Sequence, residues 1–336
     1  MIKEAIAKLV ERKNLSIEEA KSVMKEIMSG ETTPALISAY LVSLRMKGET
    51  VEEITGSAEV MRENATLIQT KHSLIVDTCG TGGDKSDTFN VSTVSAFVVA
   101  GAGIPIAKHG NRAVSSKCGS ADLVEALGVK LEIPVEKIEK CLNEIGLSYL
   151  FAPLLHSSMK YATPIRREIG IRTIFNILGP LANPAKVKAQ VIGVYAPHLV
   201  ELIINVLKNL GHSHAFVVHG ADGLDEISIT GDTKVAELKE GKILVYYIQP
   251  EDFGIKSRKL DEIKGGTKED NVKIALDVLN GEKGACRDMV VLNSSAGIVA
   301  GGKANTLWEG IKLAEESIDS KSALKKLELL REYTHS

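Results

Sequence analysis

Residues 77–120 read DTCGTGGDKSDTFNVSTVSAFVVAGAGIPIAKHGNRAVSSKCGS, and this stretch decides how the rest of the chain is interpreted. An apolar strand is expected at residues 73–76, followed by a GTGG loop that begins at Gly80 and a helix over residues 91–102. Backbone amides of a glycine loop can approach a phosphate because no Cβ blocks them, and amides at a helix start carry partial positive charge. The stretch therefore predicts an anion-binding site.

A second polar loop follows the next expected strand, residues 104–108. It reads KHGNR over residues 108–112 and is followed by three hydroxyl side chains, Ser115, Ser116 and Ser120. Because ligands of open α/β sheets bind at the carboxyl ends of the strands, we expect Lys108 and Arg112 to face the glycine loop. The pattern suits a phosphorylated small molecule, although charged loops are also commonly just solvated.

Composition restricts the classes of protein that fit. The chain has 336 residues, 44% of them hydrophobic, which is enough for two domains. Its net charge of -2 provides no overall field for nucleic acid or an anionic membrane. The four cysteines form no C-x-x-C pair, which predicts a reduced, cytoplasmic protein. The N-terminus begins an amphipathic helix rather than a signal peptide, and no apolar run approaches the ~20 residues of a membrane span.

Helix signals alone fill the first 70 or so residues. Ser16 with Glu19 and Thr50 with Glu53 form capping-box patterns, and Thr33 precedes a proline suited to the first helical turn. Beyond them, strands and helices alternate over residues 73–153, which is the signature of a parallel sheet. Helices are expected over residues 121–127, 135–145 and 198–210, and strands over residues 147–152, 189–195 and 215–219. A hairpin is expected over 234–249, and residues 271–331 are expected to be mostly helical.

Several polar residues outside the glycine stretch are candidates for chemistry. Asp225 and Glu226 follow an expected strand, and with the hydroxyl of Ser92 they offer the hard oxygen ligands that Mg²⁺ prefers. The same acids could simply begin a helix. His156 lies beside two leucines and could be an ordinary core histidine. The segment 161–184 is rich in arginine and is expected to return the chain toward the helical domain.

Six motifs occur in order along the chain, namely GTGGD (80–84), TFNVST (88–93), KHGNRAVSS (108–116), GSADLVEALG (119–128), RREIGIRTIFNILGPLANP (166–184) and DGLDE (222–226). Together they resemble the anthranilate phosphoribosyltransferase family. The related pyrimidine nucleoside phosphorylases share the fold but not the full set.

The resemblance implies an α/β fold class in which a small all-helical domain joins a large domain with a mostly parallel central sheet flanked by helices. Residues 1–71, completed by about 165–186, would form the helical domain. Residues 72–164 and 187–336 would form the α/β domain.

The implied reaction is a step of tryptophan biosynthesis, in which anthranilate and 5-phosphoribosyl 1-pyrophosphate (PRPP) give N-(5-phosphoribosyl)anthranilate and pyrophosphate. Departing pyrophosphate leaves positive charge on ribose C1, and amides, cations and a metal must stabilise the leaving group. Anthranilate can attack through its neutral nitrogen, so no conventional catalytic triad is expected.

The resemblance also implies roles for individual residues. The PRPP contacts would be Gly80, Gly83, Asp84, Thr88, Asn90, Val91, Ser92, Thr93, Lys108, His109, Gly110, Asn111, Arg112, Ala113, Val114, Ser115, Ser116 and Ser120. The anthranilate contacts would be Gly80, His109, Asn111, His156 and Arg166, whose guanidinium can hold a carboxylate by paired hydrogen bonds. Ser92, Asp225 and Glu226 match the metal positions, which implies Mg²⁺. His109 and His156 as proton acceptors are a hypothesis that rests on their placement, with His109 as the catalytic candidate.

The resemblance further implies a homodimer formed through the helical domain, and association with an anthranilate synthase stays open. Two alternative functions are a pyrimidine nucleoside phosphorylase and a non-catalytic relative that binds nucleic acid. The KHGNR loop with Arg166 disfavours the first alternative. The second would need a basic surface or loss of the acid pair, and neither is present. We therefore expect no nucleic-acid and no membrane partner.

Overall fold

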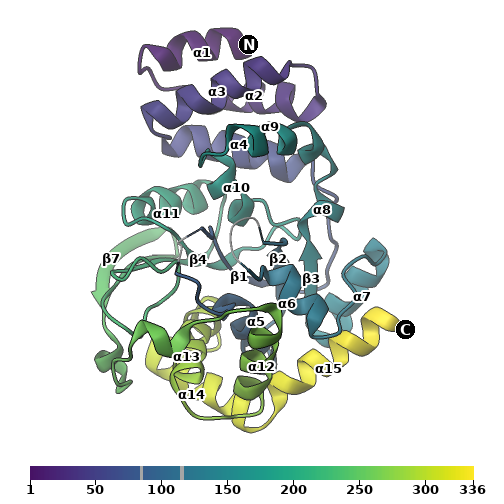
Figure 1. The fold of residues 1–336 in the computed structure, drawn as a ribbon, viewed down its shortest axis with the longest axis vertical. Coiled ribbons are helices and arrows are strands. Elements are labelled where there is room, and N and C mark those ends of the chain that lie inside the picture. Colours follow the sequence, from purple (N-terminus) through teal and green to yellow (C-terminus); the bar gives the residue numbers. More distant parts are fainter. Residues whose placement is uncertain (84–85, 114–116) are drawn as a thin grey trace.

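The computed structural model describes residues 1–83, 86–113 and 117–336, and in it a layer of helices lies against an α/β part (Figure 1). The first four helices are α1 (Ile2–Val10), α2 (Ile17–Ser29), α3 (Pro34–Lys47) and α4 (Val51–Glu63). Ser16 and Thr50 each form a capping box, and the Thr33 side chain accepts a hydrogen bond from the backbone of Leu36. These satisfied amides confirm the helix starts predicted from the sequence.

The α/β part is built on one seven-stranded sheet with the order β3-β2-β1-β4-β5-β6-β7. Neighbouring strands from β3 to β5 are parallel, whereas β6 and β7 form the antiparallel hairpin at one edge. The strands are β1 (Val76–Gly80), β2 (Ile106–Gly110), β3 (Leu147–Phe151), β4 (Ala189–Gly193), β5 (His214–Gly220), β6 (Thr233–Lys239) and β7 (Lys242–Ile248). This topology confirms the predicted fold class.

The sequence placed the first two strands too early. We expected a strand over residues 73–76, but β1 begins at Val76 and continues into the polar residues before the glycine loop. Likewise β2 begins at Ile106 rather than at residue 104. Pro105 has no N–H to donate to a ladder, and its carbonyl instead accepts the amide of Val76 in front of the Val76–Ile106 pairing. The shift moves Lys108 and His109 from the expected loop into β2.

Helices cover both faces of the sheet (Figure 1). Those of the α/β part are α5 (Val91–Gly101), α6 (Ser120–Ala126), α7 (Val135–Ile145), α8 (Ala152–Leu155), α11 (Leu199–Asn209), α12 (Lys268–Leu279), α13 (Ala285–Ala300), α14 (Leu307–Asp319) and α15 (Ser322–His335). Short 3₁₀ helices lie at Ser157–Tyr161, Pro250–Phe253 and Leu260–Ile263. The predicted hairpin and C-terminal helices are thus present.

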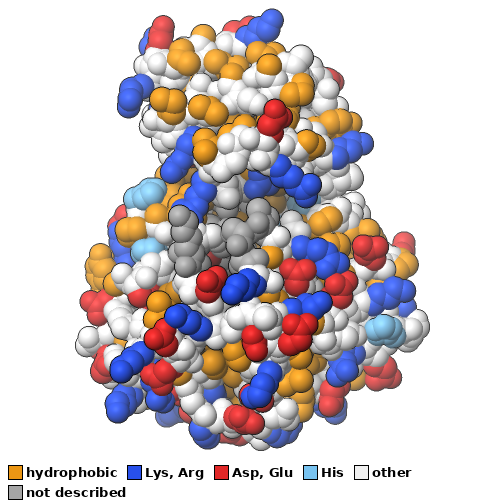
Figure 2. Space-filling model, viewed as in Figure 1, with side chains coloured by type: hydrophobic (Ala, Val, Ile, Leu, Met, Phe, Trp, Pro, Cys, Tyr) orange, Lys and Arg blue, Asp and Glu red, His pale blue; other side chains and the backbone are white. Residues whose placement is uncertain are grey.

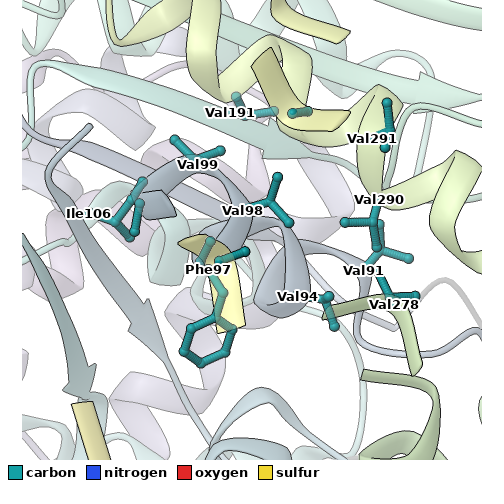
Figure 3. Close-up of a cluster of buried hydrophobic side chains, with 14 of the residues drawn as sticks. Val91, Val94, Phe97, Val98, Val99, Ile106, Val191, Val278, Val290 and Val291 are labelled. Carbon is teal, nitrogen blue, oxygen red and sulfur yellow. The ribbon is translucent and has the colours of Figure 1, made fainter. Parts of the chain in front are cut away.

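Helix α5 is the centre of the largest core cluster. Most of its side chains are buried, and they pack against α13, α14 and α15. Figure 3 shows Val94 and Val98 of α5 near Val290 of α13, with Phe97 on another side of the helix. Fully burying a valine or phenylalanine side chain stabilises a fold by roughly 1.5–3 kcal/mol, so this packing fixes the position of α5 and of the residues at its start.

The segment between β3 and β4 returns to the helical layer, as the sequence predicted. Its helices α9 (Thr163–Ile169) and α10 (Phe175–Leu181) share a core cluster with α1 to α4. The ring of Tyr161 lies so close to Gly30 that a Cβ there would come within 2.6 Å of it. We propose that the helical domain therefore comprises residues 1–71 and about 165–186. The rest of the chain would form the α/β domain.

None of the helices in the described part of the chain combines the length and the apolar character that crossing a bilayer requires.

Candidate active site

The glycine loop begins at the carboxyl end of β1, beside the end of β4. Gly82 and Gly83 have φ angles of 65° and 72°, in the left-handed region that a side chain disfavours. The amide of Thr81 donates to the carbonyl of Gly193 at the end of β4, and the amide of Gly82 donates to Asp225 Oδ2 over 2.7 Å. The loop is therefore held next to the acid pair that follows β5.

The acid pair can lie there because both neighbouring strands end in glycine. A Cβ on Gly80 would stand 2.3 Å from Asp225 Oδ2, and one on Gly193 would stand 1.4 Å from the Asp225 carbonyl oxygen. No side chain can occupy either position without displacing the acid. The ends of β1 and β4 thus form a floor on which residues 225 and 226 lie.

Ser92 in the first turn of α5 completes this group. Its amide donates to Glu226 Oε1 over 3.2 Å, and its hydroxyl accepts from Lys108 Nζ over 3.3 Å. The structure therefore brings Ser92, Asp225 and Glu226 together, as the sequence predicted. Among the described residues, no group of three or more His, Cys, Asp or Glu side chains is placed to hold a metal. This site instead offers two carboxylates and one hydroxyl. Such a partial oxygen set suits Mg²⁺ that shares its other ligands with phosphate and water.

Lys108 lies inside β2 and is almost fully buried below this group. Its ammonium also donates to the Thr78 carbonyl over 2.5 Å. Burial lowers the pKa of Lys108, and the negative charge of Asp77 partly offsets that effect. A desolvated cation beside the start of α5 is suited to an anionic ligand.

Asp77 is fully buried in β1 and ties together segments that are distant in sequence. Its Oδ1 accepts the backbone amide of His109 over 3.2 Å. Its Oδ2 accepts the side-chain amides of Asn183 and Gln190 over 2.9 and 3.2 Å. Burial raises the pKa of Asp77, whereas the charge of Lys108 and the hydrogen bonds from Asn183 and His109 oppose the rise. The network connects β1, β2 and β4 to the chain that leaves α10.

The two predicted histidines contact each other directly. His109 Nε2 and His156 Nε2 lie 3.1 Å apart, and His109 Nδ1 donates to the Gly179 carbonyl over 3.2 Å. Burial and the nearby His156 lower the pKa of His109 to about 3, and burial lowers that of His156 to about 4. Both rings are therefore neutral near pH 7, and each is a weak proton acceptor.

Arg166 lies on α9, in the segment that returns to the helical layer. Its guanidinium is half-buried and stands 5.3 Å from the centre of the Phe175 ring. Burial lowers its pKa, and no carboxylate in the described ranges forms an ion pair with it. A partly desolvated guanidinium with no counter-ion among the described residues is suited to a ligand carboxylate.

Arg112 has acidic partners that the sequence did not predict. Its guanidinium forms ion pairs with Asp122 and Glu125 over 3.1 and 2.8 Å and lies 5.5 Å from the Phe151 ring centre. These two acids of α6 hold the guanidinium of Arg112, which stays partly exposed. The charge pattern of the loop alone could not reveal this partner, because Glu125 follows Arg112 by 13 positions.

The remaining predicted contacts occupy structural positions around the site. Asn90 Nδ2 donates to the Cys118 carbonyl, and the Ser120 hydroxyl bonds Tyr149 Oη over 2.8 Å. Asn111 Oδ1 accepts the amide of Arg112. Thr88, Val91, Thr93, Gly110 and Ala113 also lie within the described ranges, and Asp84, Val114, Ser115 and Ser116 lie outside them. Burial raises the pKa of Cys79 and raises that of Cys118 to about 11, so neither thiol is activated as a nucleophile.

Sequence reasoning assigned no site role to Arg172, although it noted the arginine-rich segment. The guanidinium of Arg172 lies 4.1 Å from the Tyr195 ring centre and donates to the Gly83 carbonyl. It therefore links the segment before α10 to the glycine loop.

Figure 2 shows the molecule narrowing where the helical layer meets the α/β part, with acidic and basic side chains intermixed over the lower part.

Two family descriptions match the chain. Residues 72–324 match the a/b domain of a glycosyl transferase family, and residues 3–65 match the helical bundle domain of a glycosyl transferase family. An anthranilate phosphoribosyltransferase of Pelotomaculum thermopropionicum is 55% identical over 334 residues, covering 99% of this chain and 97% of the relative. That of Moorella thermoacetica is 52% identical over 336 residues, covering 100% and 99%.

Solved structures of the same kind of enzyme are also similar. Anthranilate phosphoribosyltransferase from Thermus thermophilus is 41% identical with a TM-score of 0.94, covering 99% of both chains. The Saccharomyces cerevisiae enzyme in complex with PRPP and Mg is 28% identical with a TM-score of 0.89, covering 99% of this chain and 98% of that one. A further structure of the yeast enzyme contains 4-fluoroanthranilate, with a TM-score of 0.88, 28% identity and the same coverage.

Proposed function

The chain belongs to the anthranilate phosphoribosyltransferase family, and we propose on that premise that its candidate active site joins PRPP to anthranilate. The enzyme is a pentosyl transferase of tryptophan biosynthesis that releases N-(5-phosphoribosyl)anthranilate and pyrophosphate. The observation that carries the proposal is the convergence of the glycine loop, the start of α5 and the Asp225–Glu226 pair at the carboxyl ends of β1 and β4. This is the place where an open parallel sheet binds its ligand.

We assign the phosphate side of the site to the glycine loop, the start of α5 and Lys108. The loop approaches a ligand closely because Gly82 and Gly83 carry no side chain, and the α5 terminus supplies partial positive charge. Lys108 adds a full charge from within the sheet. These groups would hold the pyrophosphate and stabilise the negative charge that grows on it as the bond to ribose C1 breaks.

The residues of this site fit Mg²⁺, which we include in the proposal. Glycines at positions 80 and 193 leave room for the acid pair that a Cβ would fill, and the carboxylate and hydroxyl oxygens are hard ligands. Asp225, Glu226 and Ser92 would hold the ion. When bound, Mg²⁺ would supply charge compensation for the pyrophosphate oxygens. The yeast relative was solved with both PRPP and Mg.

We assign the aromatic substrate to the side where α9 meets the sheet. Arg166 would bind the anthranilate carboxylate with two parallel hydrogen bonds. Because their pKa values are about 3 and about 4, His109 and His156 are neutral near pH 7 and would orient the substrate by hydrogen bonding. The proton that the amine loses on forming the C1–N bond can pass to water. His109 as the proton acceptor stays a hypothesis. Burial of its ring lowers the pKa of His109, which makes it a poorer base.

The proposal also includes a cytoplasmic homodimer that assembles through the helical domain, with neither a nucleic acid nor a membrane as a partner. All four cysteines are free thiols, which suits a reducing compartment. Val10 and Met46 of the helical layer expose apolar side chains that a dimer could cover. Sedimentation of the purified protein at micromolar concentration checks this part, and a monomer would refute it.

Anthranilate fluorescence tests the reaction. We expect the signal to fall when the protein, PRPP, Mg²⁺ and anthranilate are mixed, and to persist when the protein, PRPP or Mg²⁺ is left out or EDTA is added. A folded protein that leaves the signal unchanged while cleaving uridine or thymidine in phosphate would instead be a nucleoside phosphorylase.

A further inference from the structure

One buried amide on α13 contacts the loop that carries the acid pair. We propose that Asn293 is a positioning residue that fixes the backbone beside Asp225 and Glu226 and thereby sets the affinity of the site for a divalent cation. The inference rests on the proposed metal role of these two acids. Asn293 touches neither a substrate position nor a predicted metal position, and it acts through the backbone of Ile227.

The contacts of Asn293 form a closed pair. Its Oδ1 accepts the backbone amide of Ile227 over 2.8 Å, and its Nδ2 donates to the Ile227 carbonyl over 2.8 Å. The second Nδ2 proton goes to the Met289 carbonyl over 2.9 Å, one turn back in the same helix. The side-chain amide of Asn293 thus pairs with the Ile227 backbone in the way that the backbone of a neighbouring strand would. It holds the peptide group that directly follows Glu226.

The backbone around Ile227 is not part of a helix or a strand, so no regular hydrogen-bond pattern fixes it. Residues 221–232 form neither a strand nor a helix, so each of them keeps two soft dihedral angles. The loop is restrained by Asp222, whose Oδ1 accepts the amide of Leu224 over 3.1 Å, and by the floor at Gly80 and Gly193. Beyond the acids, Asn293 supplies both hydrogen bonds to Ile227. Without it, two buried peptide groups would lose their partners.

The helix that carries Asn293 is itself fixed relative to Ser92. Helix α13 packs on α5, and Gly297 of α13 allows this close approach because a Cβ there would come within 2.8 Å of Val99. Figure 3 shows side chains of the two helices meeting in one core. The separation between the Ser92 hydroxyl and the acid pair is therefore set by two packed helices. Second-layer contacts of this kind commonly change metal affinity by about 10- to 100-fold when removed.

The test measures Mn²⁺ binding by electron paramagnetic resonance in the presence of PRPP and without anthranilate, so that no turnover occurs. Asn293→Leu keeps the approximate volume and removes both bonds to Ile227. We expect about tenfold weaker Mn²⁺ binding than in the wild type. Ser295→Ala is the matched control, because that buried hydroxyl bonds only the Leu292 carbonyl of its own helix. It should leave the affinity unchanged.

Asp225→Asn separates the inference from its premise. If this variant binds Mn²⁺ like the wild type, the proposed metal site is wrong. If Asp225→Asn binds weakly while Asn293→Leu retains wild-type affinity, the metal site stands and the role of Asn293 is refuted. A lower melting temperature with unchanged affinity would likewise show a merely structural role.

A second variant covers the case in which Asn293→Leu does not fold. Asn293→Asp keeps an acceptor for the Ile227 amide and loses the donor to its carbonyl. Its added negative charge alone would strengthen cation binding, so weaker binding supports the inference. Binding equal to or tighter than that of the wild type overturns it.

Discussion

At the scale of single residues, the environment of a side chain decides its chemistry more than its type does. Both His109 and His156 look like acid–base candidates in the sequence, yet the structure buries them against each other with their Nε2 atoms 3.1 Å apart. Desolvation disfavours the charged imidazolium. The pair is therefore suited to neutral hydrogen bonding.

This pair makes stability depend on pH with a definite sign. The folded pKa values of about 3 and about 4 lie below the ordinary value of 6.5, so the unfolded chain binds more protons between about pH 3 and 6.5. The contribution of this pair to the free energy of unfolding is therefore fully present above pH 6.5 and is lost as the pH drops. Between pH 7 and 5 we expect a loss of about 1–2 kcal/mol per imidazole.

Urea unfolding of the wild type and of the His109→Asn/His156→Asn double variant at pH 7 and 5 measures this loss. The variant should lose less stability than the wild type. His198→Asn, a change at an exposed histidine, is the control. An identical pH dependence in the double variant and the wild type would contradict the assignment of neutral rings.

Arg166 makes a second prediction at this scale. Arg166→Lys keeps the charge and removes the planar fork, so we expect the KM for anthranilate to rise about 10- to 100-fold while the KM for PRPP stays within about twofold. Arg167→Lys, a change at the exposed neighbour, should alter neither constant. Steady-state kinetics with each substrate varied in turn make the measurement. Equal rises in both constants would argue against a carboxylate clamp.

At the scale of elements, strand ends matter more than strand interiors. β1 and β4 both end in glycine, and only this allows the loop after β5 to bring Asp225 between them. In Gly193→Ala the new methyl group would collide with the Asp225 backbone, which must move. Overpacking of this kind costs about 1–3 kcal/mol of stability.

We expect Gly193→Ala to lower kcat/KM for PRPP by at least about 100-fold while the KM for anthranilate changes little. Gly231→Ala is the matched control, because no atom lies within 4 Å of its added Cβ and its backbone needs no positive φ. If Gly193→Ala retained full activity with PRPP, the acid loop could not depend on the glycine floor.

Local sequence signals predicted most helices and strands. They failed where residues distant in sequence determine the structure. Capping residues such as Ser16 and Thr50 determine their helices within four positions, so the sequence was sufficient for them. The start of β1 depends on the pairing of Val76 with Ile106, and polar residues such as Asp77 looked too hydrophilic for a buried strand. The family motifs were sufficient to identify the acid pair and Arg166 as candidate site residues. No local pattern could show that Asn293 would meet Ile227, 66 positions away.

At the scale of the whole molecule, the two halves of the proposed site come from different parts of the fold. The sheet and α5 supply the glycine loop, Lys108 and the acid pair, whereas Arg166 comes from α9 in the helical layer. Asp77 and Arg172 connect the two parts through Asn183 and the glycine loop. On the proposed assignment, the molecule would hold an anionic phosphate donor on one side and an aromatic acid on the other, and the position between them would bring ribose C1 to the amine.

The central claim is that the acid pair and the glycine loop together form the site for PRPP and its metal. The most direct test is an anomalous-difference map from crystals grown with Mn²⁺ and PRPP. We predict a peak about 2.1 Å from carboxylate oxygens of Asp225 or Glu226, with the pyrophosphate against the glycine loop. A PRPP molecule bound with its metal away from both acids, or bound outside the ends of β1 and β4, would contradict the account.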